Sequence, residues 1–354
     1  MKIVTILGAR PQFIKSWSVS HALRNAGAAE VLVHTGQHYD PSLSGRFFAE
    51  LGLAEPAYNL EVGSGPQGQQ TGRILEAAER VLLAERPDWV LVYGDTNSTL
   101  GGALAAAKLH LRLAHIEAGL RSFNRRMPEE INRVLTDHVS ARLFCPSAAA
   151  AHNLAREGIA EGVEIVGDVM HASLQHFVAQ ARTSSTVLDR LGLAPQQYHA
   201  ATLHRAELTG DPERLRAVLE VLDALELPVV LPLHPRTNAT LERTGGRPRL
   251  RGGLRLVEPL GYLDFLRLVE GACRVLTDSG GLQKEAYWLG RPCVTLRSET
   301  EWTETVAAGW NTLVGTDPQQ IRAALAAPPP ALHPELYGDA HAAERIVATL
   351  VKCV

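Results

Sequence analysis

The sequence lacks several features that would have pointed to particular classes of protein. Its longest apolar runs stay well short of the ~20 residues needed to span a bilayer, so we expect no membrane partner. Its four cysteines, at 145, 273, 293 and 353, form no CxxC pair, and three lie in or beside apolar runs, which favours buried reduced thiols over metal ligands. Met1-Lys2 leads straight into an apolar run without the apolar core of a signal peptide, so the cytoplasm is the expected compartment.

The sequence also lacks a basic excess and the common cofactor patterns. Lys and Arg total 35 against 38 Asp and Glu, a formal net charge of −3, so we expect no nucleic-acid partner, although a local cluster of arginines would suffice for a small anion. The absence of GxGxxG and GxxxxGK[ST] removes support for a nicotinamide or ATP enzyme, and the absence of GxSxG does the same for acyl-enzyme chemistry. No set of ligands has metal-site spacing, so neither metal nor other cofactor is predicted.

What the sequence has is a regular alternation of short apolar runs and longer amphipathic stretches, in a chain of 354 residues that is long enough for two domains. Strands buried on both sides read as continuous apolar runs, so this pattern predicts parallel sheets covered by helices. We expect two doubly wound, Rossmann-like α/β domains facing a cleft, over 1–167 and 168–339, with a terminal helix over 340–354 packing back on the first. Strands are predicted at 3–7, 31–34, 89–93, 113–116, 143–145 and 164–166, and then at 199–202, 229–233, 254–257, 274–277, 293–296 and 312–314.

Two segments far apart in the sequence each follow an apolar run and open a helix-like stretch. In the first, Gly8 allows a tight turn, and Arg10 and Lys15 would attract phosphate to a helix N-terminus, although an ordinary basic turn fits equally well. In the second, Ser279-Gly280-Gly281 would point backbone amides at an anion. Glu285, about one helical turn later, could accept hydrogen bonds from both ribose hydroxyls. A glycine-rich turn before a solvated glutamate is the less favoured alternative, because strand, glycines and acid occur in order.

Three acids, Asp95, Glu117 and Glu129, are interpreted as lying at strand ends. Partial burial at such places can tune a carboxylate for proton chemistry. Ordinary helix-capping or first-turn acids are the alternative, which fits Glu129 well because it follows a proline. Glu130 and Arg133 are three residues apart, so local pairing could account for one of the two adjacent acids.

A histidine and an arginine, His204 and Arg205, follow a predicted strand in the second half. Such a pair can contact a phosphate and help a leaving group to depart. A lone histidine is more often structural or merely exposed, so the position after a strand is what favours the functional interpretation. His234-Pro235-Arg236 is a weaker candidate of the same kind.

Taken together, these motifs resemble those of the non-hydrolysing UDP-N-acetylglucosamine 2-epimerases, over essentially the whole chain. The motifs are GARPQFIK, VYGDTNST, HIEAGLRS, MPEEINR, ATLHRAE, VLPLHPRT and TDSGGLQKEA. The resemblance implies the fold of two-domain, B-type glycosyltransferases, a homodimer, and a UDP-sugar substrate. It also implies interconversion of UDP-GlcNAc and UDP-ManNAc, or C3- or C6-modified derivatives, by anti elimination of UDP to a 2-acetamidoglucal and its re-addition. Neither metal nor nicotinamide would be needed.

The resemblance also implies a role for each matched residue. The groups expected to act around C2 of the sugar are Asp95, Glu117 and Glu129, with Arg133 positioning them. The groups expected at the diphosphate are Arg10, Lys15, Arg205, the amides of Ser279, Gly280 and Gly281, and His204, which would also assist the departure and return of UDP. At the nucleoside we expect Glu285 on the ribose and Phe265 against the uracil, and Arg297 falls at the family's arginine after the next strand.

Two departures from the family pattern concern the substrate. Gln12 stands where the family usually has Glu, and ETEWTE over 299–304 replaces the usual TERPE. Together with HTGQHYD over 34–40, these forms resemble the branch that acts on UDP-2,3-diacetamido-2,3-dideoxyglucuronic acid. The substituents at C3 and C6 of the sugar are therefore left open, whereas epimerisation at C2 is little affected.

Three other functions would use a similar scaffold. A B-type glycosyltransferase would not need so many acids in the first domain. A hydrolysing relative would release UDP and free N-acetylmannosamine. A catalytically silent nucleotide-sugar sensor would need only the phosphate and ribose groups, and the retention of three acids and His204 argues against it.

Overall fold

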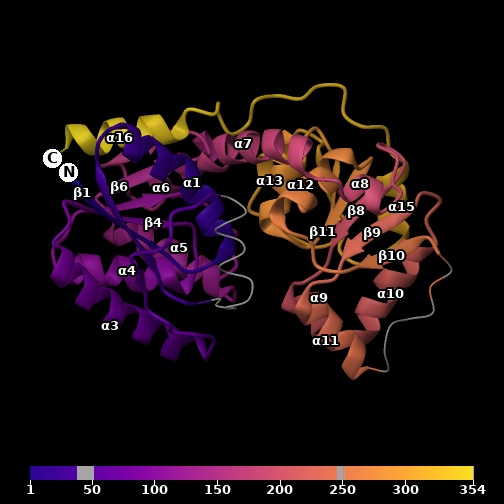
Figure 1. Cartoon of the computed structure of the whole chain (residues 1–354), viewed down its shortest axis with the longest axis horizontal. Coiled ribbons are helices and arrows are strands. Elements are labelled where there is room, and N and C mark those ends of the chain that lie inside the picture. Colours follow the sequence, from indigo (N-terminus) through magenta and orange to yellow (C-terminus); the bar gives the residue numbers. More distant parts are fainter. Residues whose placement is uncertain (38–51, 245–249, 251, 354) are drawn as a thin grey trace. The chain divides into compact units, whose positions relative to one another are not determined.

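The computed structural model describes residues 1–37, 52–244, 250 and 252–353. The chain divides into two compact units: unit 1 comprises Met1–Gln175 and Tyr337–Val354, and unit 2 comprises His176–Leu336. Each unit is a parallel sheet with its own helices (Figure 1). Helix α7 (Val169–Ser184) leads from the first unit into the second.

Unit 1 contains a seven-stranded sheet in the order β3-β2-β1-β4-β5-β6-β7, and each paired neighbour is parallel. Its strands are β1 (Lys2–Leu7), β2 (Ala29–His34), β3 (Tyr58–Asn59), β4 (Trp89–Tyr93), β5 (Leu113–Ile116), β6 (Arg142–Cys145) and β7 (Val163–Ile165). Its other helices are α1 (Arg10–Asn25), α3 (Gln67–Glu85), α4 (Asn97–Lys108), α5 (Pro128–Val139), α6 (Ala148–Arg156) and α16 (Ala342–Lys352).

Unit 2 contains a six-stranded parallel sheet in the order β10-β9-β8-β11-β12-β13. Its strands are β8 (His199–Thr202), β9 (Val229–Pro232), β10 (Leu254–Val257), β11 (Arg274–Thr277), β12 (Cys293–Thr295) and β13 (Asn311–Leu313). Its helices are α8 (Val187–Arg190), α9 (Ala206–Thr209), α10 (Pro212–Asp223), α11 (Pro235–Arg243), α12 (Tyr262–Gly271), α13 (Gly280–Trp288), α14 (Thr303–Ala307) and α15 (Pro318–Ala326).

The central strands are buried along their length because helices cover both faces of each sheet. All five residues of β4 are buried, and so are all four of β5 and β11. In unit 1 the helices approach closely where α4 carries Gly101, since a Cβ there would lie 2.6 Å from Ile74 Cγ2 of α3. The fold class predicted from the sequence, two doubly wound parallel sheets, is confirmed, and all twelve predicted runs match strands within two residues at either end.

Among the described residues, the sequence did not reveal β3, in which Tyr58 and Asn59 pair with the end of β2. A two-residue edge strand carries too little periodicity to stand out from a loop. No described helix is both long and apolar enough to cross a bilayer.

The chain returns to unit 1 through its last helix. Helix α16 packs against α1, and the apolar residues on its buried side include Ile346, Val347 and Leu350. Just before it, the carbonyl of Tyr337 accepts a hydrogen bond from the amide of Asp168, which joins the returning segment to the start of α7.

Candidate active site

Both sheets have the same topology, with the strand order reversing once. The reversal falls between β1 and β4 in unit 1 and between β8 and β11 in unit 2. In open α/β sheets ligands bind beyond the carboxyl ends of the strands at such a point. Arg10 opens the helix that follows β1, and the loops that leave β4, β8 and β11 carry Asp95, His204 and Ser279. The fold therefore places predicted site residues at the reversal point of each unit, and each such place is called a candidate half-site below.

In unit 1, the ammonium of Lys15 lies 2.5 Å from Glu117 Oε2. Glu117 is 5% exposed, and its backbone has a φ of 73°, a left-handed conformation that only a few per cent of non-glycine residues adopt. Gly94 lies next to it, with a φ of 63°, and a Cβ there would lie 3.2 Å from Glu117 Oε2. Only glycine fits Gly94 without strain, because any side chain would press on this carboxylate while forcing the left-handed backbone.

One buried guanidinium joins two carboxylates of the same half-site. Arg133 donates from Nη2 to Asp95 Oδ2 at 2.6 Å and from Nη1 to Glu130 Oε2 at 2.8 Å. The side chain of Arg133 is 5% exposed and that of Asp95 is 32% exposed. Arg133 thus fixes Asp95 from beneath and leaves part of its carboxylate accessible.

The two adjacent acids of α5 have different environments. Glu130 is buried, and its carboxylate also accepts hydrogen bonds from the amides of Ser122 and Phe123 at 2.8 and 2.9 Å. Burial acts to raise the pKa of Glu130, but these amides and Arg133 outweigh it and hold the pKa below its usual range. The predicted pairing of Glu130 with Arg133 is confirmed. Glu129 is half-buried and has no hydrogen bond or ion pair to another residue in the described part of the chain.

Gln12 ties the first loop of the half-site to the second, which the sequence did not indicate. Its Oε1 accepts hydrogen bonds from the amides of Gly8 and Ala9, at 2.8 and 3.0 Å. Its Nε2 donates to the carbonyl of Tyr93 at 2.7 Å, at the end of β4. A glutamate, as the family usually has here, could accept from both amides, but its ionised form could not donate to that carbonyl. Arg10 is exposed at the start of α1 on the same loop.

In unit 2, the loop after β8 is held by Asp278. The amides of His204 and Arg205 both donate to Asp278 Oδ2 at 2.8 Å, and His204 Nδ1 lies 3.4 Å from Oδ1. Burial lowers the pKa of His204, Asp278 opposes this, and Arg205 adds to it, so the neutral imidazole is favoured. The weaker candidate His234 lies with its ring 5.3 Å from that of His204, and burial, His204 and Arg236 lower its pKa to about 4.

The glycines of the later motif form the first turn of α13. Ser279 is the N-cap residue, and its hydroxyl accepts from the amide of Leu282 at 3.5 Å. The amides of Gly280 and Gly281 have no partner within the helix, because first-turn amides cannot have one. A Cβ on Gly280 would lie 3.6 Å from Arg205 Nη2, so that guanidinium lies beside this turn. A helix N-terminus next to a cation is a suitable site for phosphate.

The remaining predicted residues of unit 2 lie in α13, in α12 and after β12. Glu285 is 7% exposed and accepts a hydrogen bond from the hydroxyl of Tyr262 at 2.8 Å, and Phe265 lies one turn along the same helix as Tyr262. Arg297, after β12, is buried and lies 3.3 Å from Glu301 Oε2. These placements keep all three residues on loops or helices that adjoin the carboxyl end of the sheet.

The unusual segment over 299–304 contacts the glycine turn directly. The indole Nε1 of Trp302 donates to the carbonyl of Gly280 at 2.9 Å, and the ammonium of Lys284 lies 3.7 Å from the centre of its ring. In the other unusual segment, Gln37 Oε1 accepts from the amide of Ser98 at 2.9 Å, whereas residues 38–40 lie outside the described residues.

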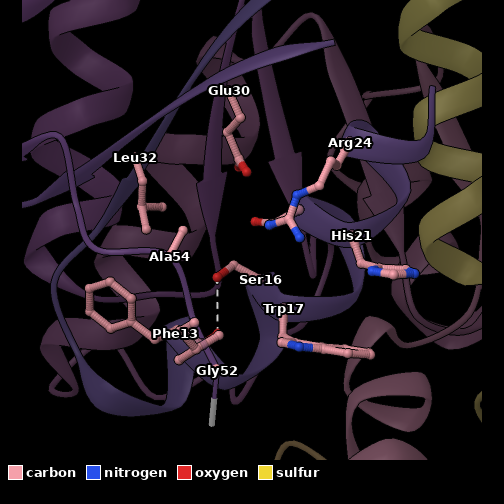
Figure 2. A pocket seen from close by; sticks show the side chains of 11 residues that line it. Phe13, Ser16, Trp17, His21, Arg24, Glu30, Leu32, Gly52 and Ala54 are labelled. Atoms are coloured by element: carbon pink, nitrogen blue, oxygen red, sulfur yellow. Dashed lines mark hydrogen bonds between the residues drawn. The ribbon is translucent and has the colours of Figure 1, made fainter. Parts of the chain in front are cut away.

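A cavity in unit 1 lies along another face of α1 (Figure 2). Its volume is about 40 Å³, room for a water molecule but not for a nucleotide sugar. Figure 2 shows Arg24 and Glu30 directed into it, and burial raises the pKa of Glu30 against the opposing hydrogen bond from Thr5. None of the predicted site residues lines it. Within the described residues, no three His, Cys, Asp or Glu side chains could jointly hold a metal ion.

Two Rossmann-like units of this topology define a known class of fold. The spinosyn forosaminyltransferase SpnP superposes on 98% of this chain, with 94% of its own chain covered, at a TM-score of 0.59 and 13% identity. At that identity the likeness shows the fold alone. The protein therefore has the two-domain architecture of the B-type glycosyltransferases.

The family follows from closer comparisons. A family model described as UDP-N-acetylglucosamine 2-epimerase matches residues 21–351. The chain therefore belongs to the UDP-N-acetylglucosamine 2-epimerase family, and it is a UDP-sugar 2-epimerase, an isomerase.

Two relatives are similar over nearly their whole length. The UDP-2,3-diacetamido-2,3-dideoxy-D-glucuronate 2-epimerase of Pseudomonas aeruginosa is 50% identical, over 99% of this chain and 100% of that protein. The crystal structure of Methanocaldococcus jannaschii UDP-GlcNAc 2-epimerase in complex with UDP-GlcNAc and UDP is 40% identical, with a TM-score of 0.91 and coverage of 99% of this chain and 100% of that one.

Proposed function

We propose that this chain epimerises a UDP-sugar at C2 without net hydrolysis, by eliminating UDP and adding it back, and that UDP-2,3-diacetamido-2,3-dideoxy-D-glucuronate is its substrate. The observation that carries the chemistry is that two carboxylates just beyond β4 and β5 are each held by a cation: Asp95 by Arg133 and Glu117 by Lys15. The substrate rests on the Pseudomonas relative and on the Gln12 and Trp302 forms of two motifs.

Unit 2 supplies the groups for the nucleotide. The amides of Gly280 and Gly281, with Arg205 beside them, would hold the diphosphate and stabilise its charge as the bond to C1 breaks. His204, which favours its neutral form, would contact the phosphates and assist the departure and return of UDP. Glu285 would bind the ribose and Phe265 would lie against the uracil, while Arg10 and Lys15 of unit 1 would add positive charge to the diphosphate.

Unit 1 supplies the groups for the sugar. A hydrogen on C2 beside an anomeric carbon is not acidic, so its removal needs the concurrent loss of a stabilised leaving group. Asp95, Glu117 and Glu129 would exchange the proton of C2, and a base or acid within hydrogen-bond reach contributes about 10²–10⁴-fold to the rate. Lys15 and Arg133 would hold Glu117 and Asp95 in place for that step.

The experiment is proton NMR of the diacetamido-glucuronate substrate with the enzyme in D₂O, run beside UDP-GlcNAc. We expect the C2 epimer with deuterium at C2 and no free sugar. With Asp95→Asn we expect neither the epimer nor the deuterium. Accumulation of free sugar and UDP would instead indicate a hydrolysing enzyme. No exchange with either substrate, despite UDP binding by calorimetry, would favour a glycosyltransferase or a sensor.

UDP-GlcNAc is the second candidate substrate, because the Methanocaldococcus enzyme, 40% identical, was solved with that sugar nucleotide. The ratio of kcat/KM for the two substrates decides between them. A ratio that favours UDP-GlcNAc would show that Gln12 and Trp302 do not mark the diacetamido branch.

We also propose that the enzyme acts as a homodimer, in the cytoplasm. One face of α5 carries Ile131, Leu135 and Val139 at intervals of four residues, each at least 36% exposed. Such a stripe suits an isologous interface with a second copy. Sedimentation should give a dimer that Leu135→Glu converts to a monomer, and a monomeric wild type would contradict the proposal.

A further inference from the structure

Beneath the two acid-bearing loops of unit 1 lies a buried histidine with no role so far. His115, in β5, is 0% exposed. Its Nδ1 lies 2.6 Å from Asp137 Oδ1, and its Nε2 lies 2.7 Å from the carbonyl oxygen of Gly94. Both ring nitrogens are therefore within hydrogen-bond distance of oxygen atoms.

Those oxygens determine where the protons of the ring must be. The carbonyl of Gly94 can only accept, so Nε2 must donate. The other oxygen of Asp137 accepts from Arg121 Nη1 at 2.7 Å and from the amide of Gly119 at 3.2 Å, which is the environment of an ionised carboxylate. Nδ1 therefore donates as well, and His115 is an imidazolium.

Arg121 is itself held in place from its other side. It makes a two-point contact with Glu157, an exposed residue, at 2.8 and 2.7 Å. Its Nη1 is thereby kept on Asp137 Oδ2, which leaves Oδ1 for the ring of His115.

The hydrogen bond from Nε2 reaches the backbone that carries both acids. The carbonyl of Gly94 belongs to the peptide that joins it to Asp95, and the amide of Gly94 donates to the carbonyl of Ile116, the residue before Glu117. Gly94 has a φ of 63°, and it lies against the carboxylate of Glu117. A donor at this place fixes the orientation of the peptide from which Asp95 projects.

We propose that His115 is a positioning residue of the epimerase: as a buried imidazolium between Asp137 and the carbonyl of Gly94, it holds the Gly94–Asp95 peptide so that Asp95 and Glu117 keep their relative placement. It touches neither substrate nor reacting atoms. The role rests on the proposed function, in which these two acids exchange the proton of C2.

Two amide substitutions separate the two hydrogen bonds. In His115→Gln the amide nitrogen falls near the position of Nε2 and can still donate to Gly94, whereas in His115→Asn it falls near Nδ1 and can donate only to Asp137. Because misplacing a reacting group by 1 Å can cost about 10²-fold, we expect His115→Asn to lower kcat by about 10- to 100-fold with KM little changed. His115→Gln should stay within about threefold of wild type. Equal losses in both variants, or none in His115→Asn, would overturn the link through Gly94.

His199→Gln is the matched control, because His199 is also buried but lies in unit 2, at the amino end of β8, the end opposite to the loop that carries His204. It should leave kcat per UDP-binding site unchanged, which separates loss of folded protein from misplacement of the acids. Calorimetric titration with UDP counts the sites in each variant. A fall in kcat for His199→Gln as large as that for His115→Asn would show that burial of a histidine alone accounts for the effect.

Nitrogen NMR of the histidine rings tests the protonation directly and needs no activity. In the full-length enzyme at the pH of the assay, the signal missing from His115→Asn should come from a ring with protons on both nitrogens. A bare nitrogen on that ring would refute the imidazolium. A wild-type enzyme without epimerase activity would refute the proposed function, and with it the positioning role, whatever the NMR result.

Discussion

Glu129 and Glu130 are neighbours in α5, which provides a matched pair of substitutions. Glu130 accepts four hydrogen bonds, from Ser122 N, Ser122 Oγ, Phe123 N and Arg133 Nη1, and is 2% exposed. Glu129 makes no polar contact with another described residue. We therefore expect Glu130→Gln to act on stability and Glu129→Gln to act on turnover.

The magnitude for Glu130→Gln follows from these contacts. Whichever way the new amide turns, its NH₂ faces a donor, either at Phe123 or at Ser122 and Arg133. At least one hydrogen bond to the charged carboxylate is lost, which removes about 1.5–3 kcal/mol of stability. At least one buried donor is also left unpaired, which costs about 1–3 kcal/mol more. We therefore expect the free energy of unfolding to fall by about 3–5 kcal/mol.

The pH dependence has a definite sign. The pKa of Glu130 is lowered on folding, so its contribution is present above the unfolded-state pKa and is lost as the pH falls through the folded value. The difference in stability between wild type and Glu130→Gln should therefore be largest near neutral pH and shrink in acid.

Glu129→Gln should leave the free energy of unfolding within about 0.5 kcal/mol, because the carboxylate has no contact to lose. Its kcat should fall by about 10²–10⁴-fold if it exchanges protons with the sugar. Urea unfolding at pH 7 and pH 4, with deuterium exchange at C2 measured on the same preparations, gives both quantities. The reasoning is refuted if Glu130→Gln unfolds like the wild type but has lost turnover, while Glu129→Gln turns over normally.

Three further predictions concern other parts of the molecule. Asp95→Asn should lower kcat by about 10²–10⁴-fold, while UDP affinity measured by calorimetry changes little, and near-normal turnover would rule out its catalytic role. Gln12→Leu leaves the buried amides of Gly8 and Ala9 without their acceptor, and each unpaired amide costs about 1–3 kcal/mol of stability. The urea midpoint of Gln12→Leu should therefore be clearly below that of Gln12→Glu, which keeps the acceptor. Equal midpoints would contradict this. Burial, with Arg274 adding to it, lowers the pKa of His199 to about 4 in the folded state. The contribution of His199 to stability is therefore present above pH ~6.5 and is lost as the pH falls towards 4. In His199→Gln the free energy of unfolding should change less with pH between these values, and an unchanged slope would count against the assignment.

The sequence revealed the features that depend on neighbours along the chain. Strands such as β4 and β11 are buried on both faces and so appear as unbroken apolar runs, and the motifs at Asp95 and Ser279 stand directly after them. The pairing of Glu130 with Arg133 was also accessible, because residues three apart on a helix face each other.

The sequence could not reveal contacts between distant segments. Lys15 and Glu117 are 102 residues apart, and Gln12 reaches Tyr93 across 81. In the sequence, the two members of each pair look independent of each other. Only the order of strands in the sheet brings them together. His115 was not recognised for a different reason: it lies inside an apolar strand, and its contacts depend on Asp137 of helix α5. The roles of the individual site residues and the functional division between the domains stay predictions.

The return of the chain to unit 1 has a consequence for synthesis. Unit 2 is continuous over His176–Leu336, whereas unit 1 needs α16, whose residues leave the ribosome only after all of unit 2. The surface of α1 that α16 covers therefore stays open to solvent while the rest of unit 1 and all of unit 2 are made. A nascent chain emerging N-terminus first would complete the later unit before the earlier one. A stop codon before Ala342 would remove Ile346 and Leu350 and leave unit 1, not unit 2, without part of its core.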